Sequence, residues 1–142
     1  MNSPIPYLNF AGNCEEAFRF YCGVFGGTAE MHRFKEMPPD VPVPPGYGDK
    51  LMHVTLLQDG RPMLMGSDAP EGFGPPFNPG NNVHLSLQPA DEAQAKTWYE
   101  ALREGGRTSM ELQPTFWAKL FAMVQDRFGV YWMISFGDPG AK

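Results

Sequence analysis

Apolar residues recur with helical spacing in two segments of the chain. The apolar positions are Ala17, Phe20, Tyr21 and Val24 in the first segment and Ala95, Trp98, Tyr99 and Leu102 in the second. Asn13 and Asp91 precede these segments as N-cap residues, and a pair of glycines follows each segment. The spacing predicts two amphipathic helices, each of which packs one apolar stripe against another element.

Strand-like runs surround both predicted helices. A short run precedes each helix, PIPYLNF at 4–10 and NNVHLSL at 81–87. Three more runs follow each helix, at 28–37, 50–58 and 62–67 in the first half and at 107–113, 120–125 and 130–136 in the second. The repeated order predicts an α+β fold of two βαβββ modules, about 1–68 and 81–137, joined by a Pro/Gly-rich linker at 69–80. We expect the two modules to form a single domain spanning residues 1–142.

Side-chain direction in the strands determines which residues face a ligand. Each helix should cover one face of its sheet, which leaves the other face free to line a cleft. In NNVHLSL, the alternation places Asn82, His84 and Ser86 on one face of the strand. His84 could act there as a metal ligand, a general base or a ligand contact, and the pattern alone leaves these roles open. His53 shares a face with Thr55 in the same way.

Composition and charge limit the partners of the chain. With 142 residues, 42% of them hydrophobic, the sequence is typical of one globular domain. The formal net charge of −5 disfavours nucleic acid and anionic membrane surfaces as partners, because both are negatively charged. No apolar run approaches the roughly 20 residues of a membrane span, and the N-terminal MNSPIPYLNF has no signal core. We therefore expect a cytoplasmic protein.

Three motifs carry a family resemblance that covers nearly the whole chain. They are PYLNFAGNCEEAFRFYCGVFGG at 6–27, MLMGSD at 63–68 and TFWAKLFAMVQDRFGVYWMISF at 115–136. The chain resembles the PhnB-like branch of the vicinal oxygen chelate superfamily, which includes glyoxalases, bleomycin-resistance proteins and extradiol dioxygenases. The resemblance implies a cupped, mixed, mostly antiparallel sheet and a homodimer. Members of this superfamily isomerise, cleave rings, transfer thiols or sequester drugs, so the resemblance does not select a reaction.

The resemblance also implies where a catalytic metal would bind, namely to His or Glu on the first and last strands of each module. The first strand offers Pro6 or Leu8 near that position, the fourth offers Met63 and Met65, and the last offers Met133. On the fifth strand Asn82 occupies the ligand position, and His84 lies two residues further on. Because thioethers favour soft ions, we expect no metal site and no other cofactor. A metal-assisted lyase, isomerase or dioxygenase, using a divalent ion, is the alternative.

We therefore predict a protein that binds a small, partly apolar molecule in its cup, and whether it is also an enzyme stays open. The candidate ligand contacts are Asn82, His84, Ser86, His53, Met65, Trp132 and Met133. His84 is the candidate catalytic residue, acting as a general base without a metal. A purely structural or interaction module is a third possibility, and the sequence does not identify the ligand.

Overall fold

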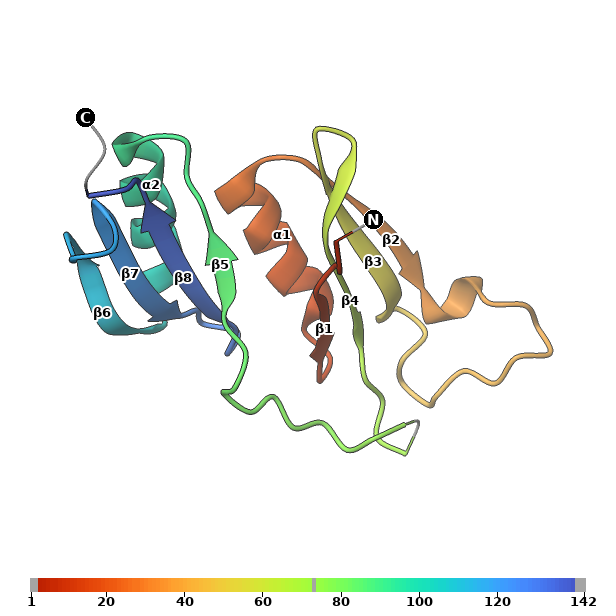
Figure 1. The fold of residues 1–142 in the computed structure, drawn as a ribbon. Helices are drawn as coiled ribbons and strands as arrows, with labels where there is room; N and C mark the ends of the chain where they lie inside the picture. The colour runs from red at the N-terminus through yellow and green to blue at the C-terminus, as the bar shows by residue number, and fades with distance from the viewer. Residues whose placement is uncertain (1–2, 73, 140–142) are drawn as a thin grey trace. The chain divides into compact units, whose positions relative to one another are not determined.

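The computed structural model describes residues 3–72 and 74–139, which fall into two compact units, Met1–Asn78 (unit 1) and Pro79–Lys142 (unit 2) (Figure 1). Unit 1 contains β1 (Tyr7–Phe10), α1 (Cys14–Phe25), β2 (Thr28–Arg33), the short 3-10 helix η1 (Phe34–Glu36), β3 (Leu51–Gln58) and β4 (Arg61–Asp68). Unit 2 contains β5 (Leu85–Leu87), α2 (Glu92–Arg103), β6 (Arg107–Gln113), β7 (Leu120–Gln125) and β8 (Tyr131–Phe136). Apart from η1, the two units repeat the same order of elements, which confirms the predicted α+β fold of two βαβββ modules.

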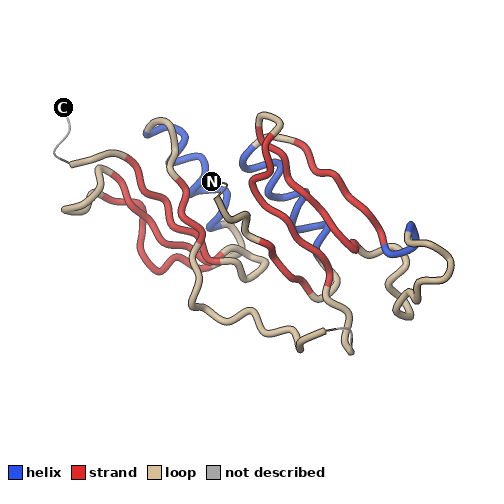
Figure 2. Tube along the Cα trace, turned by 45° about the vertical axis from the view of Figure 1, so that its right-hand side comes forward, coloured by secondary structure: helices blue, strands red, loops and turns tan. Residues whose placement is uncertain are grey.

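The two sheets also share one topology. Their strand orders are β1-β4-β3-β2 and β5-β8-β7-β6. In each sheet the first strand runs parallel to the last, and the remaining pairs are antiparallel. Each unit therefore holds a mixed, mostly antiparallel sheet with one helix packed against it (Figure 2).

Helix α2 agrees with the sequence in both its cap and its buried face. Asp91 is the N-cap, and its Oδ1 accepts a hydrogen bond of 2.8 Å from the main-chain N–H of Gln94. The buried positions are the four that the spacing predicted, Ala95, Trp98, Tyr99 and Leu102. An i, i+3, i+4, i+7 pattern on an otherwise polar segment therefore sufficed to orient this helix.

Helix α1 begins where the sequence predicted, and the prediction of its buried face was right for Ala17 and Tyr21 only. The buried residues are Cys14, Ala17, Phe18, Tyr21 and Phe25. Phe20 and Val24, which belonged to the predicted stripe, are only half-buried. Apolar side chains cover most of the circumference of this helix, so two different stripes satisfied the same spacing.

The strand predicted at 81–87 is shorter in the structure. Strand β5 contains only Leu85–Leu87, and Asn82 and Val83 lie exposed ahead of it. Gly80, with a φ of 62°, and the two asparagines that follow it favour turn conformations over a ladder. The alternation of NNVHLSL was therefore only partly a strand signal.

Neither helix of the described residues is long and apolar enough to cross a membrane.

Candidate functional site

Each sheet has one face that its helix covers, and we call the opposite face the open face. Directly paired side chains on neighbouring strands point to the same side of a sheet. In unit 1, Tyr7 pairs with Met65, Met65 with Thr55, and Thr55 with Glu30. These positions alternate with the buried Leu64, so they belong to the open face. His53 lies on the same face, two residues from Thr55.

A chain of hydrogen bonds connects three side chains on the open face of unit 1. The hydroxyl of Tyr7 lies 3.3 Å from Nδ1 of His53, and Nε2 of His53 lies 3.1 Å from the hydroxyl oxygen of Thr55. The rings of Tyr7 and His53 are 5.7 Å apart between centroids. Both ring nitrogens of His53 are therefore engaged by hydroxyl groups that come from β1 and β3.

The open face of unit 2 carries three of the predicted contacts. Ser86 pairs with Met133 on β8, and Met133 pairs with Met123 on β7. The imidazole of His84 contacts the ring of Tyr131, with centroids 5.1 Å apart. His84, Ser86 and Met133 are thus brought to one sheet, while His53 and Met65 lie on the other.

Two predicted contacts lie elsewhere. Trp132 faces α2 and is 1% exposed, and its Nε1 donates a hydrogen bond of 2.8 Å to Oδ2 of Asp126. Asn82 is exposed and precedes β5. Trp132 and Met133 are neighbours on one strand, so the alternation turns them to opposite faces.

A pocket of about 510 Å³ lies at one end of the open face of unit 2. Its wall includes Gln88, Phe116, Trp117, Ser135, Phe136 and Asp138. Gln88 lies two residues beyond Ser86, and Ser135 lies two residues beyond Met133. Sequence reasoning stopped short of this pocket, although continuing the same alternation along both segments would have reached its polar residues.

The aromatic wall of this pocket comes from the connection between β6 and β7. Phe116 is 89% exposed and Trp117 46% exposed, and their rings meet edge to face at 4.6 Å. Trp117 also packs at 5.2 Å on Phe121, a residue of β7. Main-chain N–H groups bond across the turn, from Thr115 to the carbonyl of Ala118 at 3.0 Å and from Ala118 to the hydroxyl of Thr115 at 3.1 Å. The turn and the contact with β7 hold Trp117 at the pocket.

The metal implied by the resemblance requires His or Glu on the first and last strands of each module. Where the first and last strands pair directly, they place Tyr7, Asn9, Met65, Ser67, Ser86 and Met133 on the open faces, and the same alternation in β4 and β8 adds Met63, Tyr131 and Ser135. Hydroxyls, amides and thioethers are poor ligands for the divalent ions of glyoxalase-type chemistry. Across residues 3–72 and 74–139, no group of three or more His, Cys, Asp and Glu side chains is placed to hold a metal ion. The donors that the first and last strands place on the open faces therefore do not fit the implied metal.

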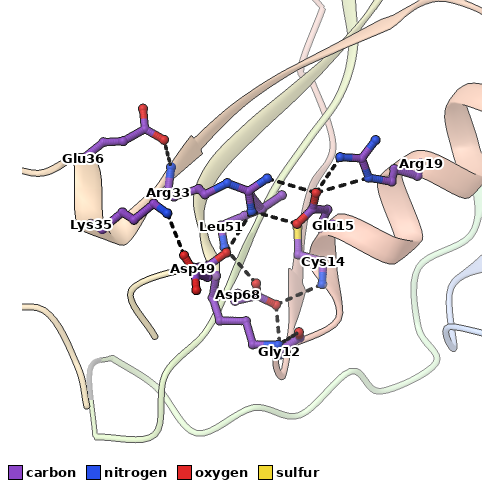
Figure 3. Close-up of polar contacts among 11 residues, drawn as sticks. Gly12, Cys14, Glu15, Arg19, Arg33, Lys35, Glu36, Asp49, Leu51 and Asp68 are labelled. Atoms are coloured by element: carbon purple, nitrogen blue, oxygen red, sulfur yellow. Dashed lines mark hydrogen bonds and ion pairs between the residues drawn. The ribbon is translucent and has the colours of Figure 1, made fainter. Parts of the chain in front are cut away.

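A polar cluster around the start of α1 in unit 1 has a structural role (Figure 3). Oδ1 of the buried Asp68 accepts hydrogen bonds from the main-chain N–H groups of Gly12 at 2.9 Å and Cys14 at 3.0 Å, and its Oδ2 accepts one from Leu51 at 3.0 Å. Asn13, the predicted N-cap, makes no side-chain cap bond, so Asp68 satisfies the first turn of α1 instead. Burial, aided by the charge of Asp68, raises the pKa of the Cys14 thiol, which stays protonated and is not a nucleophile.

Comparison with known proteins places the chain among relatives of one fold. A sequence profile described as the Glyoxalase/Bleomycin resistance protein/Dioxygenase superfamily matches residues 6–134. Protein YjdN of Escherichia coli is 32% identical over 139 residues, which cover 92% of each chain.

Two solved structures extend the comparison. Protein PA1353 from Pseudomonas aeruginosa is 40% identical, with a TM-score of 0.83 over 96% of this chain and 98% of that one. A PhnB protein from Bacillus cereus, described as a putative 3-demethylubiquinone-9 3-methyltransferase, has a TM-score of 0.75 at 23% identity over 96% and 100% of the two chains. At that identity the PhnB protein shows a shared fold and does not show a shared activity.

Proposed function

Because the chain belongs to the glyoxalase/bleomycin resistance protein/dioxygenase superfamily, we propose that it binds a small, planar, partly apolar molecule in the pocket of unit 2. The superfamily contains several unrelated activities, so the argument depends on the residues of this chain. The pocket combines exposed aromatic rings with a few polar groups, which is typical of sites for small organic molecules.

The pocket is the observation that carries this proposal. Its volume of about 510 Å³ suits a molecule of metabolite size. Trp117 offers a ring surface on which a planar ligand stacks, and the amide of Gln88 and the hydroxyl of Ser135 can orient its polar groups. We expect the stacking contact to supply most of the affinity and the two polar groups to supply selectivity.

We propose that this binding needs no divalent ion and takes place in the cytoplasm. The donors that the first and last strands place on the open faces are thioethers, hydroxyls and amides, and they support ligand contact better than metal binding. His84 lies outside the residues that line this pocket, and its ring packs against Tyr131.

We also propose that the chain forms a homodimer. Strands β1 and β5 lie at the edges of their sheets. Exposed apolar side chains lie just ahead of these strands, Ile5 before β1 and Val83 before β5. Exposed edges of this kind are commonly covered by another chain.

Tryptophan fluorescence tests the ligand pocket directly. Trp117 is 46% exposed, whereas Trp98 and Trp132 are 9% and 1% exposed, so quenching by a bound aromatic compound reports mainly on Trp117. We expect a screen of planar heteroaromatic amides and alcohols to yield compounds that quench this emission. Trp117→Ala should weaken their binding, measured by calorimetry, by about two- to tenfold, the equivalent of the roughly 0.5–1.5 kcal/mol of an aromatic pair.

Phe77→Ala is the matched control, because Phe77 is similarly exposed at 45% but lies in unit 1. It should leave the affinity of the same compounds unchanged. The proposal is wrong if no compound in the screen quenches the emission, or if Trp117→Ala binds the hits as tightly as the unaltered protein does.

A further inference from the structure

We propose that unit 1 carries a second site, in which Tyr7, His53 and Thr55 take up the proton of an aromatic hydroxyl compound and hold that compound as its anion. This site is separate from the pocket of unit 2 and uses none of its residues. It follows from the hydrogen-bond chain on the open face of unit 1.

The hydrogen-bond chain has the order hydroxyl, imidazole, hydroxyl. The oxygen of Tyr7 is 3.3 Å from Nδ1 of His53, and the oxygen of Thr55 is 3.1 Å from Nε2. A neutral imidazole has one N–H donor and one acceptor nitrogen, whereas a hydroxyl can donate or accept. In the neutral state, one of the two hydroxyls must therefore donate to the ring.

Protonation of the ring reverses that arrangement. Both nitrogens of the imidazolium donate, so the oxygens of Tyr7 and Thr55 both accept. The O–H of Tyr7 is then free to donate outward, and the ring carries a positive charge close to it. With His53 protonated, the O–H of Tyr7 is a hydrogen-bond donor next to the imidazolium cation, and this combination suits an oxyanion.

The proton transfer balances without any further reactant. The O–H of the ligand gives its proton to the oxygen of Tyr7 while Tyr7 passes its own proton to Nδ1 of His53. Tyr7 ends as a neutral phenol, His53 gains one proton and the ligand becomes an oxyanion. Histidine suits this role because its charge ordinarily changes between about pH 5 and 8.

The surroundings select an aromatic ligand and its direction of approach. Tyr7 is 46% exposed and Thr55 only 9% exposed, so the ligand reaches the Tyr7 end of the hydrogen-bond chain. Met65 pairs with Tyr7 on one side and with Thr55 on the other, which places its thioether beside the chain. Sulfur contacts with aromatic rings are favourable, so a ring bearing an acidic hydroxyl fits this surface.

Two titratable groups on β2 act on His53 from the neighbouring strand. His32 lies directly opposite His53, and Glu30 lies opposite Thr55. A protonated His32 opposes proton uptake by His53, while Glu30 favours it, and His32 Nδ1 is itself 3.6 Å from Oε1 of Glu36. On β1 and β4 the open-face positions beside the chain, Asn9 and Ser67, carry no charge.

The test uses 4-nitrophenol, whose anion absorbs visible light while its neutral form does not. In a buffer acidic enough to keep most of the free compound neutral, the protein should increase the visible absorbance in a saturable way. His53→Gln should abolish this increase. Tyr7→Phe, which keeps the ring but loses the hydroxyl, should weaken binding by about tenfold, as expected for a hydrogen bond to a charged group.

His84→Gln is the matched control, since His84 also contacts a tyrosine ring but lies in unit 2. It should leave the absorbance increase intact, and His32→Gln should preserve or strengthen it. Proton NMR gives a second readout, because the Cε1 proton of His53 should move in the direction of protonation when 4-nitrophenol is added. Circular dichroism checks that each variant is folded.

The outcomes separate this proposal from the proposed pocket. An increase that survives in folded His53→Gln, or no increase with the unaltered protein at millimolar concentrations, overturns the proton-uptake site. An increase that is lost only in Trp117→Ala assigns the compound to the pocket of unit 2 and overturns the site as well. Loss in His53→Gln with retention in Trp117→Ala supports it, whatever the result of the heteroaromatic screen.

Discussion

Glu15 of α1 binds two arginines, Arg19 in the same helix and Arg33 at the end of β2. Its carboxylate accepts hydrogen bonds from Arg33 at 2.7 and 3.0 Å and from Arg19 at 2.6 and 3.1 Å. The bonds from Arg33, and after them those from Arg19, lower the pKa of Glu15 from its usual 4.5 to about 2. Arg33 lies well beyond α1 in the chain, so part of this ion pair is a tertiary contact of unit 1.

The shifted pKa of Glu15 predicts a pH-dependent contribution to stability. A lowered folded-state pKa gives stability that is present above the unfolded value and lost as pH falls through the folded value. Glu15→Gln should therefore lower the free energy of unfolding by about 1 kcal/mol at neutral pH, since solvent screens the exposed Arg19. Urea titrations should show the difference shrinking from about pH 4.5 and vanishing near pH 2.

Glu16→Gln is the natural comparison, because Glu16 sits beside Glu15 in the first turn and is exposed. It should show a smaller and less pH-dependent change. A difference for Glu15→Gln that stays constant from neutral pH to pH 2 would contradict the assignment to this ion pair.

Local alternation was enough to predict which neighbouring side chains share a face, whereas their role as ligand contacts stays a prediction. The pattern brought His84, Ser86 and Met133 to one sheet and His53 and Met65 to the other, because strand alternation is a property of the backbone. It could not reveal that Tyr7 bonds to His53, since that contact depends on strands far apart in sequence. For the same reason, the sequence assigned the cap of α1 to Asn13, whereas Asp68 supplies it.

At the scale of elements, Gly66 determines how closely α1 and β1 approach β4. A Cβ atom at this position would lie 2.7 Å from the carbonyl oxygen of Leu8 and 2.7 Å from the ring of Phe18. The main-chain contact cannot relax by a rotamer change. Gly66→Ala should therefore lower the free energy of unfolding by about 1–3 kcal/mol, as overpacking typically does.

Gly23 provides the opposite case within α1. A Cβ atom there would meet nothing within 4 Å, and the residue is exposed. Gly23→Ala should raise the free energy of unfolding by about 0.5–1 kcal/mol, because alanine is the better helix former. Chemical denaturation of both variants measures the two effects, and equal changes in the same direction would refute the close-approach argument.

The bounds of an element were predicted best where its sequence fitted only one structural pattern. Strands β6 and β7 match the predicted runs at 107–113 and 120–125. Strand β5 is shorter than its run because glycine and asparagine at its start favour turns. In α1 the surplus of aromatic residues allowed two stripes, and packing against β3 and β4 selected one.

At the scale of the whole chain, the repeat of topology does not extend to chemistry. The hairpin of unit 1 closes through Asp59 and Gly60, with φ values of 52° and 75°. In unit 2 the corresponding turn is longer, and the buried Asp126 accepts bonds from the main-chain N–H groups of Phe128 and Val130. The sequence predicted the repeat from its pattern, but it could not predict the pocket, which depends on how the connection with Phe116 and Trp117 folds.

The proposed homodimer can be tested through the mass of the protein in solution. Light scattering at micromolar concentration should give twice the chain mass of 15.8 kDa. Val83→Lys, which puts a charge beside the edge strand β5, should shift the equilibrium towards the monomer, and Phe77→Lys, an exposed change in the connecting segment, should not. A mass of 15.8 kDa for the unaltered protein would contradict the proposal.

The hydrogen bonds of Asp68 also determine which positions of unit 1 tolerate a change of sequence. All three of its partners are main-chain N–H groups, which every amino acid except proline supplies. The hydrogen bonds at positions 14 and 51 therefore do not depend on the side chains there, whereas position 68 requires a carboxylate of one length. Position 68 thus bears the side-chain requirement for a junction that joins three segments, and positions 14 and 51 are left to vary within the limits of packing.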